Sequence, residues 1–239
     1  MKKLKLKPIV AFNKCSDAGP DTSDFAVFMN GCNLCCPYCM NNELRESKDA
    51  YHDLMPNLKK TVDKCKPEKI FISGGEPTLN HLALFYLCGK FKSWGCNVGL
   101  STNGTFPDII ENLVLKYEKI DYVALDLKGD ARVYKLLGNV DYFFKVLSSW
   151  SILRKAKREI KGFDYEIRTT LYPPFVGIPI NGLANLFQPD EKWILQQFRK
   201  APKMPDKKAK KVEIYSDTYL KMLLSDAKQI VPNVELRVV

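Results

Sequence analysis

The sequence contains few of the groups that enzymes most often use as acids and bases. Only two of its 239 residues are histidines, His52 and His81, and because neither lies in a motif we expect both on the surface. No run approaches the roughly 18 apolar residues of a membrane-spanning helix. The basic start of the chain lacks the apolar stretch of a signal peptide. We therefore expect a cytoplasmic protein, in a compartment where thiols stay reduced.

Acidic residues are also fewer than basic ones. The chain has 37 Lys and Arg against 27 Asp and Glu, a formal charge of +10, and the excess is concentrated in residues 2–7 and 199–211. A solvated face is the ordinary interpretation of such runs. A surface for an acidic partner, or for nucleic acid, is the alternative. With two prolines and almost no apolar residues, Ala201–Lys211 is predicted to be a mobile loop.

Short apolar runs alternate with helix-like stretches along the chain. The predicted strands are residues 25–29, 69–73, 97–101, 122–127, 166–171, 193–198 and 234–238. The predicted helices are residues 54–65, 80–93, 107–117, 142–157, 181–187 and 217–229, with Asn80 as an N-cap. This alternation predicts βα units and a parallel sheet. Six or seven units are too few for an eightfold barrel, so we expect an α/β fold: a partial, open (β/α)6-type TIM-like barrel. Functional residues in such folds follow the strands.

Half of the eight cysteines fall within eight residues, directly after the first predicted strand. In a reducing compartment, clustered thiols indicate metal ligands. Cys32, Cys36 and Cys39 have the spacing C-x3-C-x2-C, whereas Cys35 allows other spacings such as C-x2-C-x3-C. Zinc and [4Fe–4S] sites normally take four protein ligands, so a three-cysteine loop would leave one iron open. Three ordinary buried thiols are the simplest alternative. Three more cysteines are expected in the core: Cys65, Cys88 and Cys96.

Other polar motifs follow the next predicted strands. In Ser73–Thr78 (SGGEPT), two glycines allow a sharp turn and a close approach of the backbone, and Glu76 adds an acceptor suited to an ammonium group. An isolated copy would be a plain βα turn. Ser101–Gly104 (STNG) follows the third strand and Asp126–Lys128 (DLK) the fourth. Arg168, on the fifth strand, needs a partner, either a ligand carboxylate or a structural one such as Asp126.

Taken in this order, the segments resemble the radical S-adenosylmethionine (SAM) superfamily. Its signature is a C-x3-C-x2-C loop with an aromatic residue before the last cysteine, here Tyr38. The resemblance implies that Cys32, Cys36 and Cys39 hold one [4Fe–4S] cluster, that SAM binds the fourth iron, and that Cys35 is not a ligand. It implies no catalytic acid or base. The implied cofactor-binding residues are Tyr38, Gly74, Gly75, Glu76, Thr102, Asn103, Asp126, Lys128 and Arg168.

Within the superfamily, the chain most resembles the glycyl-radical enzyme activases that serve anaerobic ribonucleoside-triphosphate reductase. The resemblance implies that SAM is cleaved to methionine and a 5′-deoxyadenosyl radical, which removes a hydrogen atom from a glycine of the large partner enzyme. An external one-electron reductant would supply the electron. Two departures are Met40, where activases commonly have His, and Ser101, where they commonly have Asp. The second puts a shared monovalent cation site in doubt.

Three other functions stay open at this point. One is a small-molecule radical SAM enzyme such as a 7-carboxy-7-deazaguanine synthase. Another is radical modification of nucleic acid, which rests on the positive charge alone. The third is an iron–sulfur or zinc protein with a structural or electron-carrier role. For each we expect one domain over residues 1–239, with a short N-terminal extension (1–22), a C-terminal helix–strand segment (about 200–239) and no membrane association.

Overall fold

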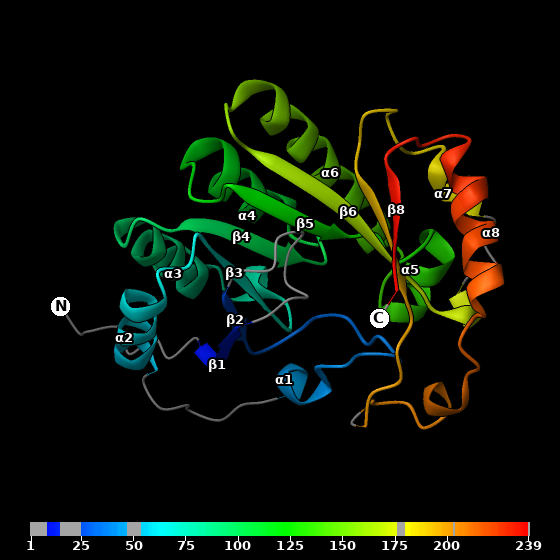
Figure 1. Ribbon diagram of the computed structural model, residues 1–239, viewed down its shortest axis with the longest axis horizontal. Coiled ribbons are helices and arrows are strands. Elements are labelled where there is room, and N and C mark those ends of the chain that lie inside the picture. The colour runs from blue at the N-terminus through cyan, green and yellow to red at the C-terminus, as the bar shows by residue number, and fades with distance from the viewer. Residues whose placement is uncertain (1–8, 15–24, 47–53, 176–179, 203, 239) are drawn as a thin grey trace.

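One eight-stranded sheet organises the protein (Figure 1). The computed structural model describes residues 9–14, 25–46, 54–175, 180–202 and 204–238. The strands are β1 (Ile9–Lys14), β2 (Phe25–Met29), β3 (Lys69–Gly74), β4 (Asn97–Thr102), β5 (Tyr122–Asp126), β6 (Asp164–Leu171), β7 (Trp193–Gln197) and β8 (Val234–Arg237). The α-helices are α1 (Asn42–Glu46), α2 (Met55–Cys65), α3 (His81–Ser93), α4 (Pro107–Glu111), α5 (Ala131–Leu137), α6 (Asp141–Glu159), α7 (Ile180–Ala184) and α8 (Asp217–Lys228).

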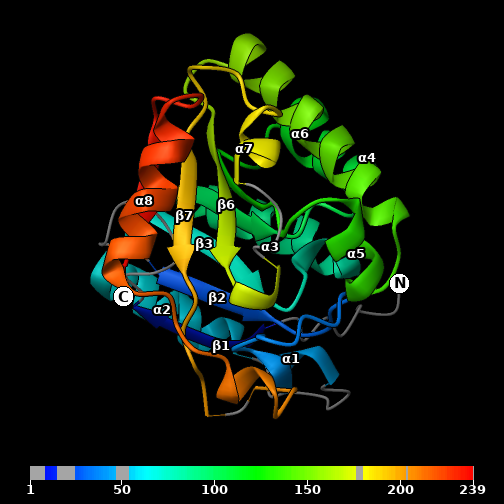
Figure 2. The ribbon, with the colours of Figure 1, turned by 90° about the vertical axis from the view of Figure 1, so that its right-hand side faces the viewer.

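The strands lie side by side in chain order, from β1 to β8. Strand β1 is antiparallel to β2, and the seven strands β2–β8 are parallel to one another. The sheet is curved (Figure 2), and it does not close, because the described strands β1 and β8 are not paired. Right-handed crossovers in such an order place the helices on one face, where Leu58, Leu84, Trp150 and Leu220 join the strands in the main core. The predicted α/β partial barrel is confirmed.

Most predicted elements are present, and the differences are local. All seven predicted strands form, with ends shifted by two residues or fewer. The predicted helix over 107–117 is α4 followed by a π-helical turn, Asn112–Lys116. Asn80 caps α3 as expected, since its side chain accepts a hydrogen bond from the backbone N of Ala83 at 3.4 Å. Strand β1 and the short helices α1 and α5 were not predicted, because each has too few residues to show a periodic apolar pattern.

The segment Ala201–Lys211, predicted as a mobile loop, is largely irregular in its described part and is held by buried side chains. Met204 and Ala209 are buried, and Ala209–Lys211 forms a 3-10 turn. These apolar residues were too few to suggest packing from sequence, yet they anchor the segment in a second hydrophobic cluster. The other buried members of that cluster are Leu34, Cys36, Tyr38, Val133, Leu137, Tyr172 and Phe198.

The cysteines and histidines outside the motifs lie mostly as expected. Cys88 and Cys96 are buried and His81 is exposed, whereas His52 and Cys15 lie outside the described residues. The prediction for Cys65 is wrong: it is exposed, because the buried face of α2 consists of Leu58 and Val62 and the helix ends at Cys65. Within the described ranges, no helix has the length and apolar character needed to cross a membrane.

A buried carboxylate, Glu191, joins α6 to the last strands of the sheet. It accepts hydrogen bonds from Trp150 Nε1 at 2.6 Å, from Arg154 Nε and Nη2 at 2.8 and 2.6 Å, and from the Tyr165 hydroxyl. The backbone N of Gln188 donates a further bond at 2.6 Å. Burial alone would raise the pKa of Glu191, but the bonds led by Arg154 reverse this and hold the pKa below its ordinary value.

We expect Glu191→Gln to lower the free energy of unfolding by about 2 kcal/mol near pH 7, since bonds to a charged group are lost. A carboxyl whose pKa is depressed in the folded state stabilises the fold above its unfolded pKa, and this stabilisation is lost as the pH falls through the folded pKa. The difference between variant and wild type should therefore shrink in acid. Denaturant titrations at several pH values measure it, with exposed Glu159→Gln as the control. A pH-independent difference would contradict the assignment.

Candidate active site

The carboxyl ends of the parallel strands surround a cavity of about 390 Å³, which is within the range of small-molecule sites. Of the twelve predicted site residues, all but Glu76 line it. The eleven that line it are Cys32, Cys36, Tyr38, Cys39, Gly74, Gly75, Thr102, Asn103, Asp126, Lys128 and Arg168. Strand order alone explains this convergence, because parallel strands bring their carboxyl ends to one edge of the sheet.

The cysteine loop, residues 30–41, connects β2 to α1. Cys32, Cys36 and Cys39 line the cavity, whereas Cys35 is exposed and is not part of the lining. The backbone N of Cys35 donates to the carbonyl of Leu137 at 3.0 Å, which ties this side of the loop to the end of α5. Of the two spacings that the sequence left open, C-x3-C-x2-C is therefore the one that faces the cavity.

The three cavity thiols are of the ligand type that iron–sulfur clusters take. Among the residues that the structure describes, no three His, Cys, Asp or Glu side chains converge closely enough to hold one metal ion. A [4Fe–4S] cluster takes one thiolate per iron, so its ligands are spread around a wider centre. Burial raises the pKa of Cys32 and raises that of Cys36 to about 11, while the Lys128 ammonium opposes both shifts. Ligation by these cysteines stays a prediction.

Gly74 and Gly75 allow the end of β3 to pack against the cysteine loop. The backbone N of Gly75 donates to the Met29 carbonyl at 2.9 Å, and that of Glu76 donates to the Gly31 carbonyl at 2.7 Å. A Cβ at Gly75 would lie 2.0 Å from the Gly31 oxygen, and one at Gly74 would lie 2.1 Å from the Met29 oxygen. The glycine pair thus serves contact between two loops as well as access for a ligand.

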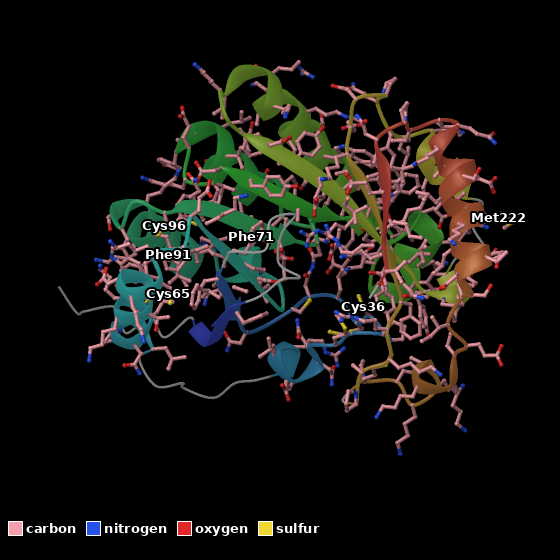
Figure 3. All side chains as sticks on the ribbon, in the orientation of Figure 1. Cys36, Cys65, Phe71, Phe91, Cys96 and Met222 are labelled. Carbon is pink, nitrogen blue, oxygen red and sulfur yellow. The ribbon has the colours of Figure 1, made fainter. Side chains whose placement is uncertain are left out.

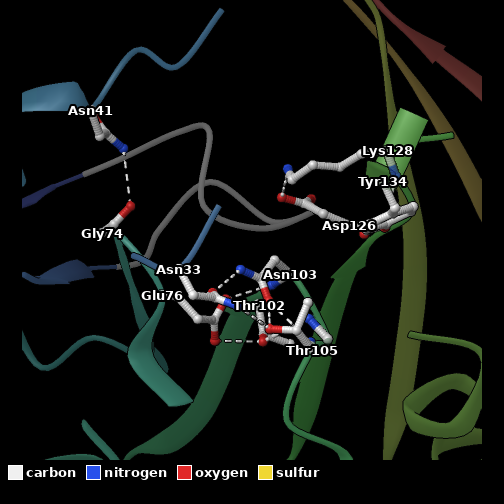
Figure 4. Close-up of polar contacts among 11 residues, drawn as sticks. Asn33, Asn41, Gly74, Glu76, Thr102, Asn103, Thr105, Asp126, Lys128 and Tyr134 are labelled. Carbon is white, nitrogen blue, oxygen red and sulfur yellow. Dashed lines mark hydrogen bonds and ion pairs between the residues drawn. The ribbon is translucent and has the colours of Figure 1, made fainter. Parts of the chain in front are cut away.

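Glu76 is turned away from the cavity and holds the neighbouring loop (Figure 4). Its carboxylate accepts from the backbone N of Thr78 at 3.0 Å, from the Thr102 hydroxyl at 2.7 Å and from the backbone N of Asn103 at 2.6 Å. The Thr78 hydroxyl donates a further short bond. Burial raises the pKa of Glu76, and these four bonds oppose the rise. In this arrangement Glu76 positions Asn103, whereas the sequence suggested an acceptor for an ammonium group.

Asn33 and Thr105, which the sequence analysis did not single out, complete this network. Asn103 Nδ2 donates to Asn33 Oδ1 at 2.9 Å, and Asn33 Nδ2 donates to the Thr105 hydroxyl at 2.8 Å. Thr105 returns a bond to Asn103 Oδ1 at 2.7 Å. The loops that follow β2, β3 and β4 are thus connected by side chains. Only the position of Asn33 inside the cysteine motif could have indicated this from sequence.

Asp126 and Lys128 form an ion pair at the end of β5. Lys128 Nζ lies 3.0 Å from Asp126 Oδ2, and the lysine side chain is 13% exposed. Burial by itself would lower the pKa of Lys128, but the Asp126 carboxylate and the nearby Tyr38 and Cys36 hold it well above its usual value. Tyr134 fixes the turn, since its hydroxyl accepts from the Lys128 backbone N at 3.1 Å and donates to the Asp126 carbonyl at 3.2 Å. Lys128 is therefore a fixed positive charge beside Cys36.

Arg168 has a structural partner, but this partner is Glu166 and not Asp126. The two side chains share one face of β6 and form a buried ion pair through Arg168 Nε. The Tyr122 hydroxyl donates to the other Glu166 oxygen at 2.9 Å. Arg237 Nη2, on β8, lies 3.9 Å from Glu166. The prediction missed Glu166 because a buried acid in an apolar strand carries no motif.

Tyr38 and polar residues of the last two strands also line the cavity. The Tyr38 ring packs against Tyr172 with ring centroids 4.8 Å apart, and its buried hydroxyl has no hydrogen-bond partner among the described residues. Such a hydroxyl fits a site whose ligand brings the missing partner. Polar residues of β7 and β8 and the turn after β7 also line the cavity, namely Gln196, Gln197, Arg199 and Arg237. Their place at or just after the carboxyl end of β7 was the available signal for the first three.

Comparisons with known proteins agree on one family. The model of the radical SAM superfamily matches residues 26–173. A Methanocaldococcus jannaschii protein, named as a glycyl-radical enzyme activating enzyme, is 30% identical over 92% of this chain and 91% of its own length. The 7-carboxy-7-deazaguanine synthase of Hyperthermus butylicus is 33% identical over 43% of this chain and 44% of its own. A radical SAM methyltransferase structure from Sphaerobacter thermophilus covers 91% of this chain and 67% of that chain with a TM-score of 0.65 at 14% identity, which supports the fold alone.

We expect Gly75→Ala to disrupt the site, because its methyl group would lie 2.0 Å from the Gly31 oxygen, a backbone atom that cannot move without shifting Cys32. The variant should unfold at lower denaturant concentration and retain less iron after reconstitution. Gly89→Ala, in α3, is the matched control, since nothing lies within 4 Å of its new methyl group. That change should stabilise the helix by about 0.5–1 kcal/mol. Equal iron content in both variants would contradict the role of Gly75.

Proposed function

The chain belongs to the radical SAM superfamily, and from this premise we propose that it is a glycyl-radical enzyme activase whose partner is an anaerobic ribonucleotide reductase. The observation that carries the proposal is the cavity shared by Cys32, Cys36 and Cys39 with the polar ends of β3 to β6. The activase class is supported by the Methanocaldococcus jannaschii relative, because the match covers 91% of that protein's length. The reductase as partner rests on the motif resemblance.

The described side chains have separable tasks in this proposal. Cys32, Cys36 and Cys39 would hold a [4Fe–4S] cluster, and the ends of β3 to β6 would hold SAM. When bound, the cluster and SAM supply a 5′-deoxyadenosyl radical that removes a hydrogen atom from the substrate. The chain itself provides binding and orientation, with no acid or base required. The Asp126–Lys128 pair fixes a charge beside Cys36, and the Asn33–Asn103 bond fixes the distance between two loops.

The open sheet suits a macromolecular substrate. Because β1 and β8 are not paired, the cavity is not enclosed by a complete barrel. A glycine on an extended loop of a large enzyme could then reach the cavity without this chain unfolding. We propose that residues 1–239 act as a single domain in this reaction, with β8 contributing Arg237 to the cavity wall.

A small-molecule substrate is the second candidate, and one observation favours it. The cavity wall includes polar side chains from near the end of the chain, Gln196, Gln197, Arg199 and Arg237, as a pocket for an anionic metabolite would. The resemblance over 43% of the chain to a 7-carboxy-7-deazaguanine synthase points the same way. The two candidates share the cluster and SAM and differ only in what donates the hydrogen atom.

We expect Cys36→Ala to lose most of the cluster absorbance and nearly all 5′-deoxyadenosine formation after anaerobic reconstitution, since one thiolate ligand is removed. Cys35→Ala should keep both within about twofold, because Cys35 is exposed and does not face the cavity. Iron analysis and chromatography of the nucleoside product measure these effects. A Cys35 variant that loses the cluster would show that the other cysteine spacing supplies the ligands.

The activase proposal predicts a protein-based radical. Reduced protein, SAM and an anaerobic ribonucleotide reductase should together give the doublet EPR signal of a glycyl radical. A reductase with that glycine changed to alanine is the control and should stay silent. Active SAM cleavage without any doublet would overturn the proposed partner. Consumption of a small anionic substrate under the same conditions would then establish the second candidate.

A further inference from the structure

We propose that the basic segment, residues 204–213, is a docking surface for an acidic one-electron carrier protein. The proposal rests on the proposed function, because it concerns how a cluster bound at the cysteine loop receives its electron. The carrier loses one electron and the cluster gains it, so no atom or proton is transferred. What the structure adds is a surface of the required charge, directly against the loop that would hold the cluster.

The segment is packed onto the cysteine loop from outside the sheet. Met204 and Ala209 are buried in the same hydrophobic cluster as Cys36 and Tyr38. Leu137, at the end of α5, belongs to this cluster and also accepts the hydrogen bond from Cys35. In Figure 3, Cys36 lies beside the segment, whose side chains extend away from the sheet. The segment and the cysteines are therefore neighbours in space, although more than 160 residues separate them in the sequence.

The charge of this segment is positive. Residues 204–213 include four lysines, Lys207, Lys208, Lys210 and Lys211, against two acids. Lys207, Lys208 and Lys211 are exposed, and none of them forms an ion pair with a described residue. Asp206, one of the two acids, accepts a hydrogen bond from the backbone N of Lys208 at 2.7 Å. Three exposed ammonium groups thus belong to a segment whose buried residues share a hydrophobic cluster with the cysteine loop.

This surface lies outside the cavity. Its position therefore favours a partner that does not need to enter the cavity. The lining includes Arg199, which precedes the segment, and no described residue from 204 to 213. A protein on this surface would leave the cavity free for SAM and substrate. A reductant has that requirement, because the electron must arrive while both are bound.

Electrostatic complementarity between such surfaces mainly raises the association rate and makes it sensitive to salt. The three exposed lysines would therefore raise the association rate of an acidic carrier protein and make that rate sensitive to salt. Nucleic acid would also be attracted, but it supplies no electron. The position of the charge beside the cysteine loop, rather than around the cavity mouth, therefore favours the carrier.

The test uses the reconstituted full-length protein and an acidic plant-type [2Fe–2S] ferredoxin, a class with potentials near −400 mV. The variant is Lys207→Gln, Lys208→Gln and Lys211→Gln together, which leaves Met204 and Ala209 in place. The matched control removes three charges at the far end of α6 and the turn after it, Lys155→Gln, Arg158→Gln and Lys161→Gln. Two quantities are measured: the Kd of oxidised ferredoxin by titration, and the rate of cluster reduction by reduced ferredoxin in stopped flow.

We expect the segment variant to bind ferredoxin at least tenfold more weakly at low salt and to be reduced correspondingly more slowly. The control variant should match the wild type within twofold. Reduction by dithionite, a small molecule that needs no docking surface, should be equal in all three proteins. Raising the salt concentration should slow the wild type toward the rate of the segment variant.

Several results would overturn the proposal. One is equal ferredoxin binding and reduction in the segment variant and the wild type. Another is salt-dependent RNA binding that the variant loses while its reduction by ferredoxin is unchanged. Loss of reductase binding without any change in ferredoxin reduction would likewise assign the surface to the substrate enzyme. Normal docking and reduction with no SAM cleavage would contradict the proposed function and leave the docking surface intact.

Discussion

The arrangement of the site depends on one buried carboxylate. Glu76 is 1% exposed, and its contacts with described residues are hydrogen bonds rather than ion pairs. A buried carboxylate without a cation is costly unless its oxygens are fully hydrogen-bonded, so the donors on Thr78, Thr102 and Asn103 must stay in place. These donors come from the loop after β3 and from the end of β4 with the loop that follows it. If Asn103 moved outward, the buried Glu76 carboxylate would lose a hydrogen bond. The cost of that loss keeps the two loops at a fixed separation.

The cavity opens at the carboxyl ends of the strands, whereas aromatic side chains fill the interior of the partial barrel at the amino ends. Phe71 and Tyr122 pack edge to face inside the sheet with ring centroids 6.0 Å apart. A Cβ on Gly99 would lie 2.6 Å from the Phe71 ring, so a glycine on β4 makes room for it. Above the rings lies the Glu166–Arg168 pair, followed by the cavity. Because aromatic side chains fill the interior at the amino ends of the strands, the interior formed by the described strands is accessible only from the carboxyl ends. The buried ion pair lies between the aromatic side chains and the cavity.

The sequence predicted the parts of this structure that follow from local pattern. Apolar runs gave the seven parallel strands, and the rule that functional residues follow strands located Cys32, Gly75, Asn103 and Lys128 at one edge. It failed where partners are distant in the chain. Nothing near Arg168 indicated Glu166 over Asp126, since both acids are plausible partners until the strand faces are known. The burial of Cys65 was predicted wrongly, because tertiary packing decides whether the last turn of a helix is covered. Strand β1 was missed because a six-residue strand at a sheet edge has no distinctive apolar period.

The order of the strands also explains why the cysteine loop has two accessible sides. The loop follows β2, which is separated from the edge of the sheet by β1 alone, whereas the ends of β4 to β6 lie in the middle. One side of the loop presents Cys32, Cys36 and Cys39 to the cavity, and the other presents Cys35 to solvent. A redox centre at the middle of the sheet could be reached only through the cavity, in competition with SAM and substrate. Under the proposed function, a cluster on this loop would have an outer side through which an electron could enter while the cavity stays occupied.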